Sequence, residues 1–166
     1  MKRNTIMDRV DKILGHEIFL CHLSEIRKRE IDRRFDKHDL SHLLDVARIG
    51  EIINLESGLG IERELIYAAA LLHDVGRDIE YDTGKLHDLA GAEVAPQILT
   101  DCGFNDAETD MIVEAIRSHG DAAVSGENTL RGVLYRADKA SRRCFACDVV
   151  QECHWSDDKK NLKIRY

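Results

Sequence analysis

Hydrophobic residues recur every three or four positions along most of the chain, which is the spacing of one face of an α-helix. The first segment, residues 5–34, has this spacing at Ile6, Val10, Ile13, Leu14 and Ile18. Later segments with the pattern are 40–55, 61–76, the stretch after His87, 105–120 and the stretch from about 127 toward 143. The pattern predicts an all-α fold, a single bundle of about five to seven helices.

Several residues predict where these helices begin, bend and end. Asn105 with Glu108 three positions later is typical of a capping box, and Gly120 is a typical stop. Pro96 is expected to kink or restart its helix, because proline removes a backbone donor. The end of the chain alternates Leu162, Ile164 and Tyr166, which predicts an extended piece that docks on the bundle.

Composition limits the class of protein. The chain has 166 residues, of which 33% are charged and 43% hydrophobic, as expected for one globular domain. It has no apolar run of the roughly 18 residues that a membrane helix needs, and no apolar region follows Met1 as in a signal peptide. We therefore expect a cytoplasmic protein without a membrane partner, and the net charge of −7 disfavours nucleic acid as a partner.

Five polar residues lie on the apolar faces of these segments, where hydrophobic residues are expected. They are His42, His73, His87, His119 and Asp138. A single buried histidine is commonly a hydrogen-bonded core residue, but five such residues would each need a separate partner. One shared cation satisfies them together, and histidine and carboxylate are ligands of first-row transition metals. Asp74 can join His73 at one ion near a helix end, which Gly76 supplies.

The order of these residues resembles the H…HD…D pattern of the HD-domain superfamily of metal-dependent phosphohydrolases. His42 lies in HLLDVARIGEII, His73 and Asp74 in YAAALLHDVGR, and Asp138 in LYRADKASR. The resemblance covers residues 38–143 and implies a single HD domain over 1–166. The domain would comprise an N-terminal helix over 5–34, this core, and a cysteine-containing tail over 144–166.

Two further histidines are similar to those of the bimetallic HD branch, which includes bacterial diadenosine tetraphosphate hydrolases and cyclic-dinucleotide phosphodiesterases. His87 lies in GKLHDLAGAE and His119 in AIRSHG. The resemblance implies one ion at His42, His73, Asp74 and Asp138, and a second at His87 and His119, with Asp74 bridging. The alternatives are a helix-start residue for His87 and a helix-dipole partner for His119. The longer GYP-type motif is absent.

The resemblance implies a metal-dependent phosphohydrolase in which a water activated by two metals attacks the phosphorus atom. The bond is a phosphomonoester, phosphodiester or phosphoanhydride bond of a small nucleotide-like molecule. Iron or manganese is expected, with nickel, cobalt or zinc admissible. Asp74 would orient the nucleophile. Arg77, and then Lys139 and Arg142, would contact phosphate oxygens, unless they are surface or salt-bridged residues.

Two other functions stay open. Some HD proteins resemble di-iron oxygenases, and the chain could also be a non-enzymatic module that responds to metal or redox state through its tail. The amphipathic first helix either covers the core or forms a homodimer. We expect no role at the site for His16, His22 or His38 beyond capping, surface contacts or support of a ligand.

The tail contains a second group of metal-capable residues. Cys144 and Cys147 form a Cys-x-x-Cys pair, and Cys153 and His154 follow shortly after. Three thiols this close suit a structural zinc or an iron–sulfur cluster, with His154, Cys21 or Cys102 as the fourth ligand. Free thiols without metal and a redox disulfide are the alternatives.

Overall fold

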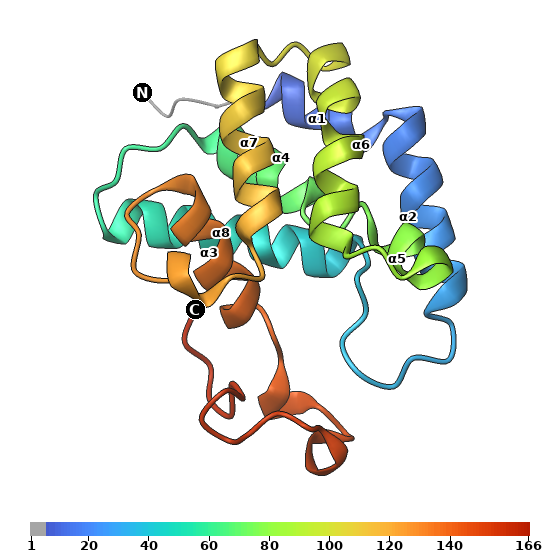
Figure 1. Cartoon of the computed structure of the whole chain (residues 1–166). Coiled ribbons are helices and arrows are strands. Elements are labelled where there is room, and N and C mark those ends of the chain that lie inside the picture. The colour runs from blue at the N-terminus through green and yellow to red at the C-terminus, as the bar shows by residue number, and fades with distance from the viewer. Residues whose placement is uncertain (1–5) are drawn as a thin grey trace.

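The computed structural model describes residues 6–166, and within this range the chain forms helices and loops without a strand (Figure 1). The all-α class predicted from the sequence is confirmed. The α-helices are α1 (Asp8–Leu14), α2 (Glu17–Arg29), α3 (Leu40–Glu56), α4 (Arg63–Leu72), α5 (Arg77–Thr83), α6 (His87–Asp101), α7 (Asp106–Ser118) and α8 (Leu130–Ala140). The short 3₁₀-helices are η1 (Ala122–Val124), η2 (Cys144–Ala146) and η3 (Val150–Glu152).

The first predicted segment is two helices rather than one, and Thr5 lies outside the described residues. The chain turns at Gly15, and the His16 ring accepts a hydrogen bond from the backbone N–H of Ile18, which caps α2. The His16 ring also lies 3.1 Å from Asp101 at the end of α6. The break therefore lets two short helices wrap the bundle in place of one long helix.

The later segments agree more closely with the structure. The Asn105–Glu108 capping box is present at the start of α7. Helix α6 runs through Pro96 as a single helix, so the proline does not restart it. Helix α4 ends at Leu72, not at Gly76, and the short helix α5 that follows was not predicted because it carries almost no apolar pattern.

Helix α4 is the centre of the bundle, and it packs against α1, α3, α6, α7 and α8. Its buried residues include the run Ala68, Ala69 and Ala70, none of which has exposed surface. Small side chains allow neighbouring helices to approach α4 closely from several sides. The last turn of α4 is thereby placed where the ends of the other helices meet.

A close contact next to α4 involves Gly76. A Cβ atom at this position would lie 2.4 Å from the backbone nitrogen of Gly91 and 2.5 Å from the carbonyl oxygen of His87. Both atoms belong to the first turns of α6, so only glycine allows α6 to pack against the turn after α4. This contact holds the start of α6, and with it His87, beside Asp74.

The tail extends from one end of the bundle, below α8 in the view of Figure 1. The side chains of Leu162, Ile164 and Tyr166 are exposed, so this alternating segment does not dock on the bundle through them as expected. Instead Asn161 donates hydrogen bonds to the carbonyl oxygens of Lys139 and Arg142 at 2.7 and 3.1 Å. These bonds satisfy acceptors at the C-terminal end of α8.

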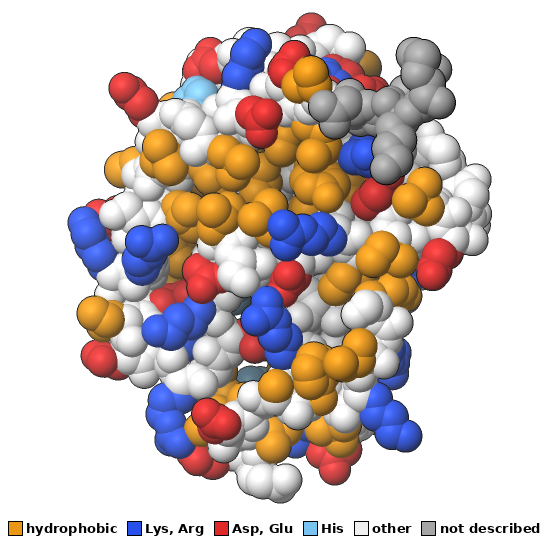
Figure 2. Space-filling model, turned by 180° about the vertical axis from the view of Figure 1, so that it is seen from behind, with side chains coloured by type: hydrophobic (Ala, Val, Ile, Leu, Met, Phe, Trp, Pro, Cys, Tyr) orange, Lys and Arg blue, Asp and Glu red, His pale blue; other side chains and the backbone are white. Residues whose placement is uncertain are grey.

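The surface is mixed in character. Figure 2 shows hydrophobic side chains gathered on the face opposite to that of Figure 1, with Lys and Arg side chains beside them. A homodimer through such a face stays a prediction. No helix in residues 6–166 is long and apolar enough to cross a membrane.

The contact at Gly76 generates a prediction about stability. We expect Gly76→Ala to lower the free energy of unfolding by about 1–3 kcal/mol or more, because the added methyl group meets backbone atoms that cannot rotate away. Gly120→Ala is the matched control, since a Cβ there meets nothing within 4 Å and the position also follows a site histidine. Urea unfolding of both variants measures the difference; equal stabilities would contradict the role of this contact.

Candidate metal centre

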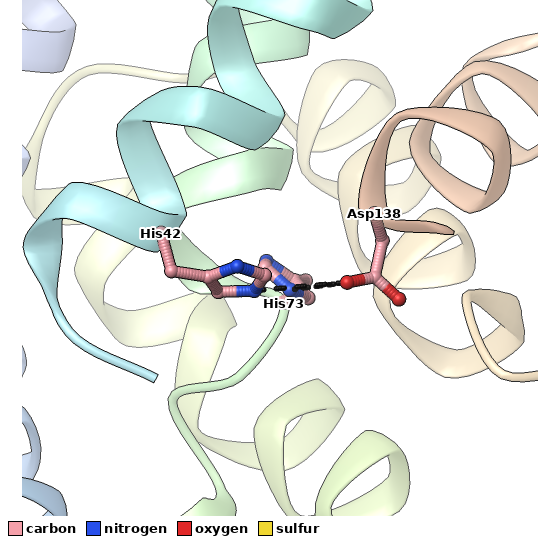
Figure 3. A group of neighbouring side chains, drawn as sticks. All are labelled: His42, His73 and Asp138. Atoms are coloured by element: carbon pink, nitrogen blue, oxygen red, sulfur yellow. Dashed lines mark ion pairs between the residues drawn. The ribbon is translucent and has the colours of Figure 1, made fainter. Parts of the chain in front are cut away.

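Six side chains that the sequence singles out converge at the inner ends of five helices. His42 lies in the first turn of α3, His73 caps the end of α4, His87 begins α6 and His119 caps the end of α7. Asp74 follows His73 directly, and Asp138 lies in the last turns of α8. Figure 3 shows His42, His73 and Asp138 pointing toward one another from α3, α4 and α8.

Asp74 is the centre of this group, and its carboxylate is only 2% exposed. Its Oδ2 atom lies 3.4 Å from Nε2 of His42 and 3.1 Å from Nε2 of His73. Its Oδ1 atom lies 3.6 Å from Nε2 of His87 and 3.9 Å from Nε2 of His119. Each oxygen therefore faces its own pair of histidines.

Asp138 completes the first of these pairs. Its Oδ1 atom lies 3.6 Å from Nε2 of His42 and 3.7 Å from Nε2 of His73. Metal–ligand bonds of about 2.1 Å place neighbouring ligands of one ion roughly 3.0–3.4 Å apart. The observed separations are close to this range, and the ligand atoms of His42, His73 and Asp138 all lie within 4.8 Å of one another, so these three residues could hold one transition-metal ion with Asp74 beside them.

The second nitrogen of each ring fixes its orientation. His73 and His119 donate Nδ1–H to the carbonyl oxygens of Ala70 and Ile116, each at 2.6 Å. Nδ1 of His87 lies 2.9 Å from the Glu80 carboxylate, and Nδ1 of His42 lies 3.4 Å from the Ser141 hydroxyl. A proton on Nδ1 leaves the Nε2 lone pair facing the centre, which is the usual arrangement of a metal-ligating histidine.

The Nε2 atoms themselves lack ordinary partners. Those of His42 and His73 are buried without a well-directed hydrogen bond. Nε2 of His87 lies 3.1 Å from Nε2 of His119, so two lone pairs face each other in the tautomers that the Nδ1 contacts favour. Buried nitrogens in this arrangement are stabilised by a cation between them. The donor set therefore fits a metal at both histidine pairs.

The electrostatics of the protein groups agree with this donor set. Burial opposes the charged form of His73, but the Asp74 and Asp138 carboxylates outweigh it and raise the pKa of His73 to about 10. Burial and the nearby His73 lower the pKa of His119 to about 4, and burial with Arg77 lowers the pKa of His87. The second pair is thus held neutral, as metal ligation requires, whereas a metal at His73 displaces a proton.

Two of the three cationic residues named from the sequence form salt bridges with the carboxylates of the centre. Arg77 donates from Nε to Asp74 Oδ1 at 2.9 Å and also contacts Glu80. Lys139 donates to Asp138 Oδ2 at 2.7 Å. Despite opposing burial, histidines and these cations hold the pKa values of Asp74 and Asp138 well below their ordinary range. Arg142 lies elsewhere, with its guanidinium 3.5 Å from the centre of the Trp155 ring.

The structure adds one residue that sequence reasoning treated as incidental. His38 is buried, and its Nε2 atom lies 4.0 Å from Asp74 Oδ2. Its backbone N–H and its Nδ1 atom both contact the Glu30 carboxylate, which also accepts a hydrogen bond from the Tyr81 hydroxyl at 2.6 Å. Although burial opposes it, these contacts lower the pKa of Glu30 to about 2, so Glu30 is a carboxylate. His38 therefore has a fixed ring and a free Nε2 facing the centre.

The remaining histidines have structural contacts. His22 on α2 lies 2.8 Å from a carboxylate oxygen of Asp78 on α5. Asp39, in the second His-Asp pair of the sequence, caps α3 by accepting from the backbone N–H of His42. His154 is exposed in the tail. No helical spacing marks His38 in the sequence, because it precedes the first residue of α3 and Glu30 holds its ring.

A cavity of about 170 Å³ opens beside the centre, with His42 in its wall. Lys37 and Arg143 also line it, together with Asp36, Asp39 and Asp45. Arg143 is held there by contacts with Ser41 and Asp45 on α3. A small molecule in this cavity would lie next to the first histidine pair and would meet both cationic and anionic side chains.

Comparisons with known proteins agree with this geometry. The model of the HD domain matches residues 39–143, a range that includes all six residues of the centre and ends just before Cys144. A crystal structure of a predicted HD superfamily hydrolase from an uncultured Thermotogales bacterium superposes with a TM-score of 0.64 at 24% identity. The superposition covers 88% of this chain and 80% of that one, and it supports the same fold.

The relatives in sequence include an uncharacterized protein of similar length and longer proteins named ribonuclease Y. An uncharacterized protein of Clostridium beijerinckii is 42% identical over 96% of this chain and 100% of its own length. Ribonuclease Y of Acetivibrio thermocellus is 30% identical and that of Mycoplasma mycoides subsp. mycoides 28%; the matches span 78% and 70% of this chain. They span only 27% and 21% of those longer proteins. Because the HD-domain model matches more than half of the chain, the chain belongs to the HD-domain family.

Proposed function

We propose that the chain is a phosphohydrolase that binds two transition-metal ions and hydrolyses a phosphoester or phosphoanhydride bond of a small nucleotide-like molecule. The observation that carries this proposal is the position of the Asp74 carboxylate between two pairs of histidines. Its Oδ2 atom lies 3.1–3.4 Å from the Nε2 atoms of one pair, and its Oδ1 atom lies 3.6–3.9 Å from those of the other. His42, His73, Asp74 and Asp138 would hold one ion, and His87, His119 and Asp74 the other.

Each residue near the centre has a distinct role in the proposed hydrolysis. Bound ions would supply Lewis acidity to the phosphate and lower the pKa of a nearby water. Asp74 holds the two ligand sets in register and orients the attacking water. Arg77 and Lys139 already contact the two carboxylates, so a short side-chain movement brings their charge to the non-bridging phosphate oxygens. Iron or manganese suits the mixture of imidazole and carboxylate, and nickel, cobalt and zinc are also admissible.

His38 supplies the proton that the leaving oxygen needs. The carboxylate of Glu30 holds Nδ1–H of the ring, so the imidazolium form of His38 has its second proton on Nε2, directed at the centre, and transfer of that proton leaves the neutral ring. Protonation of the leaving oxygen matters most for alkoxide leaving groups such as a ribose hydroxyl. This placement favours ester substrates over activated anhydrides.

The class of substrate follows from charge and space. The cavity beside His42 is small, and the net charge of −7 opposes binding of an extended polyanion. A mononucleotide, dinucleotide or dinucleoside polyphosphate is therefore the leading candidate. The relatives named ribonuclease Y favour a phosphodiester and make RNA the second candidate.

The proposal is tested directly by turnover. The purified chain, supplied with iron, manganese, cobalt or nickel, is expected to hydrolyse p-nitrophenyl phosphate esters and dinucleoside polyphosphates faster than single-stranded RNA. Chelation should abolish the activity, and the metal should restore it. Absence of turnover on every phosphoester, with metal shown to be bound, would overturn the hydrolase assignment, and preferential cleavage of RNA would overturn the small substrate.

If both ions share the Asp74 carboxylate, substitutions at the centre should change the metal content of the protein in different ways. We expect Asp74→Asn to weaken the binding of both ions, because each carboxylate oxygen belongs to one ligand set. His119→Ala should release only one of about two equivalents of metal per chain. Elemental analysis after gel filtration measures the stoichiometry, with His16→Ala as the histidine control. Equal losses in Asp74→Asn and His119→Ala would argue against a carboxylate shared by two ions.

The position of His38 predicts a dependence on the leaving group. We expect His38→Ala to slow hydrolysis of an alkyl or nucleoside ester by about 10²–10⁴-fold and that of a p-nitrophenyl ester much less, because p-nitrophenolate leaves without protonation. His22→Ala is the control, since that ring contacts Asp78 instead of the centre. A loss of the same size on both substrates would assign His38 a structural role only.

A further inference from the structure

Three cysteines of the tail line one small cavity, although they come from separate turns. Cys144, Cys147 and Cys153 border it together with Phe35, Asp36 and Trp155. The cavity has a volume of about 30 Å³, enough for one small occupant. The other two cysteines do not border it: Cys102 is buried in the core, and Cys21 is exposed on α2. Sequence spacing alone could not separate the three from the two.

Local geometry explains why the three thiols share this space. Cys144 begins η2, and the backbone N–H of Cys147 bonds to its carbonyl oxygen at 3.3 Å. Cys153 ends η3, where its N–H bonds to the carbonyl oxygen of Val150 at 3.4 Å. Two tight turns thus direct thiols into one place, and a Cys-x-x-Cys turn is a common chelating unit.

The tail has almost no hydrophobic core of its own. Between residues 144 and 166 only Val149 and Asn161 are buried. Its other contacts with the rest of the chain include the two hydrogen bonds donated by Asn161, an exposed salt bridge from Arg34 to Glu152 and the stacking of Arg142 on Trp155. Exposed salt bridges contribute little, so these contacts give little stability to a segment whose helices have only three residues. Small folded units of this kind are commonly held by a metal.

We propose that Cys144, Cys147 and Cys153 bind one zinc ion, with the carboxylate of Asp36 as the fourth ligand. Zinc accepts three thiolates with one further nitrogen or oxygen ligand in a closed tetrahedral site. An iron–sulfur cluster would need a fourth cysteine and more space. Unlike the ligand atoms of His42, His73 and Asp138, the three sulfur atoms do not all lie within 4.8 Å of one another. Zinc binding would therefore draw the two turns together.

Asp36 is a better fourth ligand than His154. Cys153 has an extended backbone, in which successive side chains point to opposite sides, and His154 is exposed and does not border the cavity. Charge also balances: three thiolates, one carboxylate and Zn²⁺ leave two negative charges, and Arg142 and Lys160 border the same cavity.

This site would fix one wall of the cavity beside His42. Asp36 borders both cavities, and it lies in the loop between α2 and α3 that begins after Glu30 and includes His38. Zinc at the cysteines thus ties the tail to the loop that carries His38. The zinc site does not depend on the proposed hydrolysis, because none of its ligands belongs to the histidine centre.

Metal binding by variants tests the site. The whole chain is stripped of metal under reducing conditions and titrated with Co²⁺ and then Zn²⁺. We expect thiolate-to-cobalt charge-transfer bands in the wild type, in Cys21→Ser and in Asp74→Ala, and their loss in Cys147→Ser and Cys153→Ser. One equivalent of zinc should be lost with them. Asp36→Asn should weaken zinc binding, whereas His154→Ala should not.

Thiol protection tests the unaltered protein, in case a cysteine variant does not fold. Zinc should slow alkylation of Cys144, Cys147 and Cys153, located by peptide mass spectrometry, and leave alkylation of Cys21 unchanged. It should also slow proteolysis within residues 144–166. Alkylation unaffected by zinc, a disulfide between Cys144 and Cys147 in place of metal, or iron with acid-labile sulfide would each overturn the proposal.

Discussion

The structure depends on one buried carboxylate. Asp74 is almost fully enclosed, and a buried carboxylate is strongly unfavourable unless charged or polar groups surround it. Its partners come from five elements: His42 on α3, His73 at the end of α4, Arg77 on α5, His87 on α6 and His119 at the end of α7. The arrangement of the helices is thus also the arrangement of polar groups that makes this charge tolerable.

Small residues make that convergence possible. The alanine run of α4 lets its neighbours approach, and the contact of Gly76 with the backbone of Gly91 and His87 brings α6 against the turn after α4. A larger residue at Gly76 would meet backbone atoms of α6 at 2.4–2.5 Å, so α6 and the histidine that begins it would have to shift. The apolar core therefore contributes to the chemistry of the centre by its packing, without supplying a reactive group.

The sequence allowed the main features to be predicted for physical reasons. His42, His73, His119 and Asp138 interrupt apolar faces, and such an interruption is visible without a structure because helical spacing is regular. The break between α1 and α2 and the short helix α5 could not be predicted, since they depend on the His16 cap and on polar contacts such as that between His22 and Asp78. The role of His38 was equally hidden, because Glu30 and Tyr81, which hold its ring, become neighbours only in the folded chain.

The rings of His73 and His119 donate to carbonyl oxygens three residues earlier in their own helices. The number of residues in each helix therefore determines where its histidine ring lies. An inserted residue would advance the ligand by about 1.5 Å and rotate it by about 100°. By contrast with exposed loops, α4 and α7 cannot gain or lose a residue before these histidines and keep the centre.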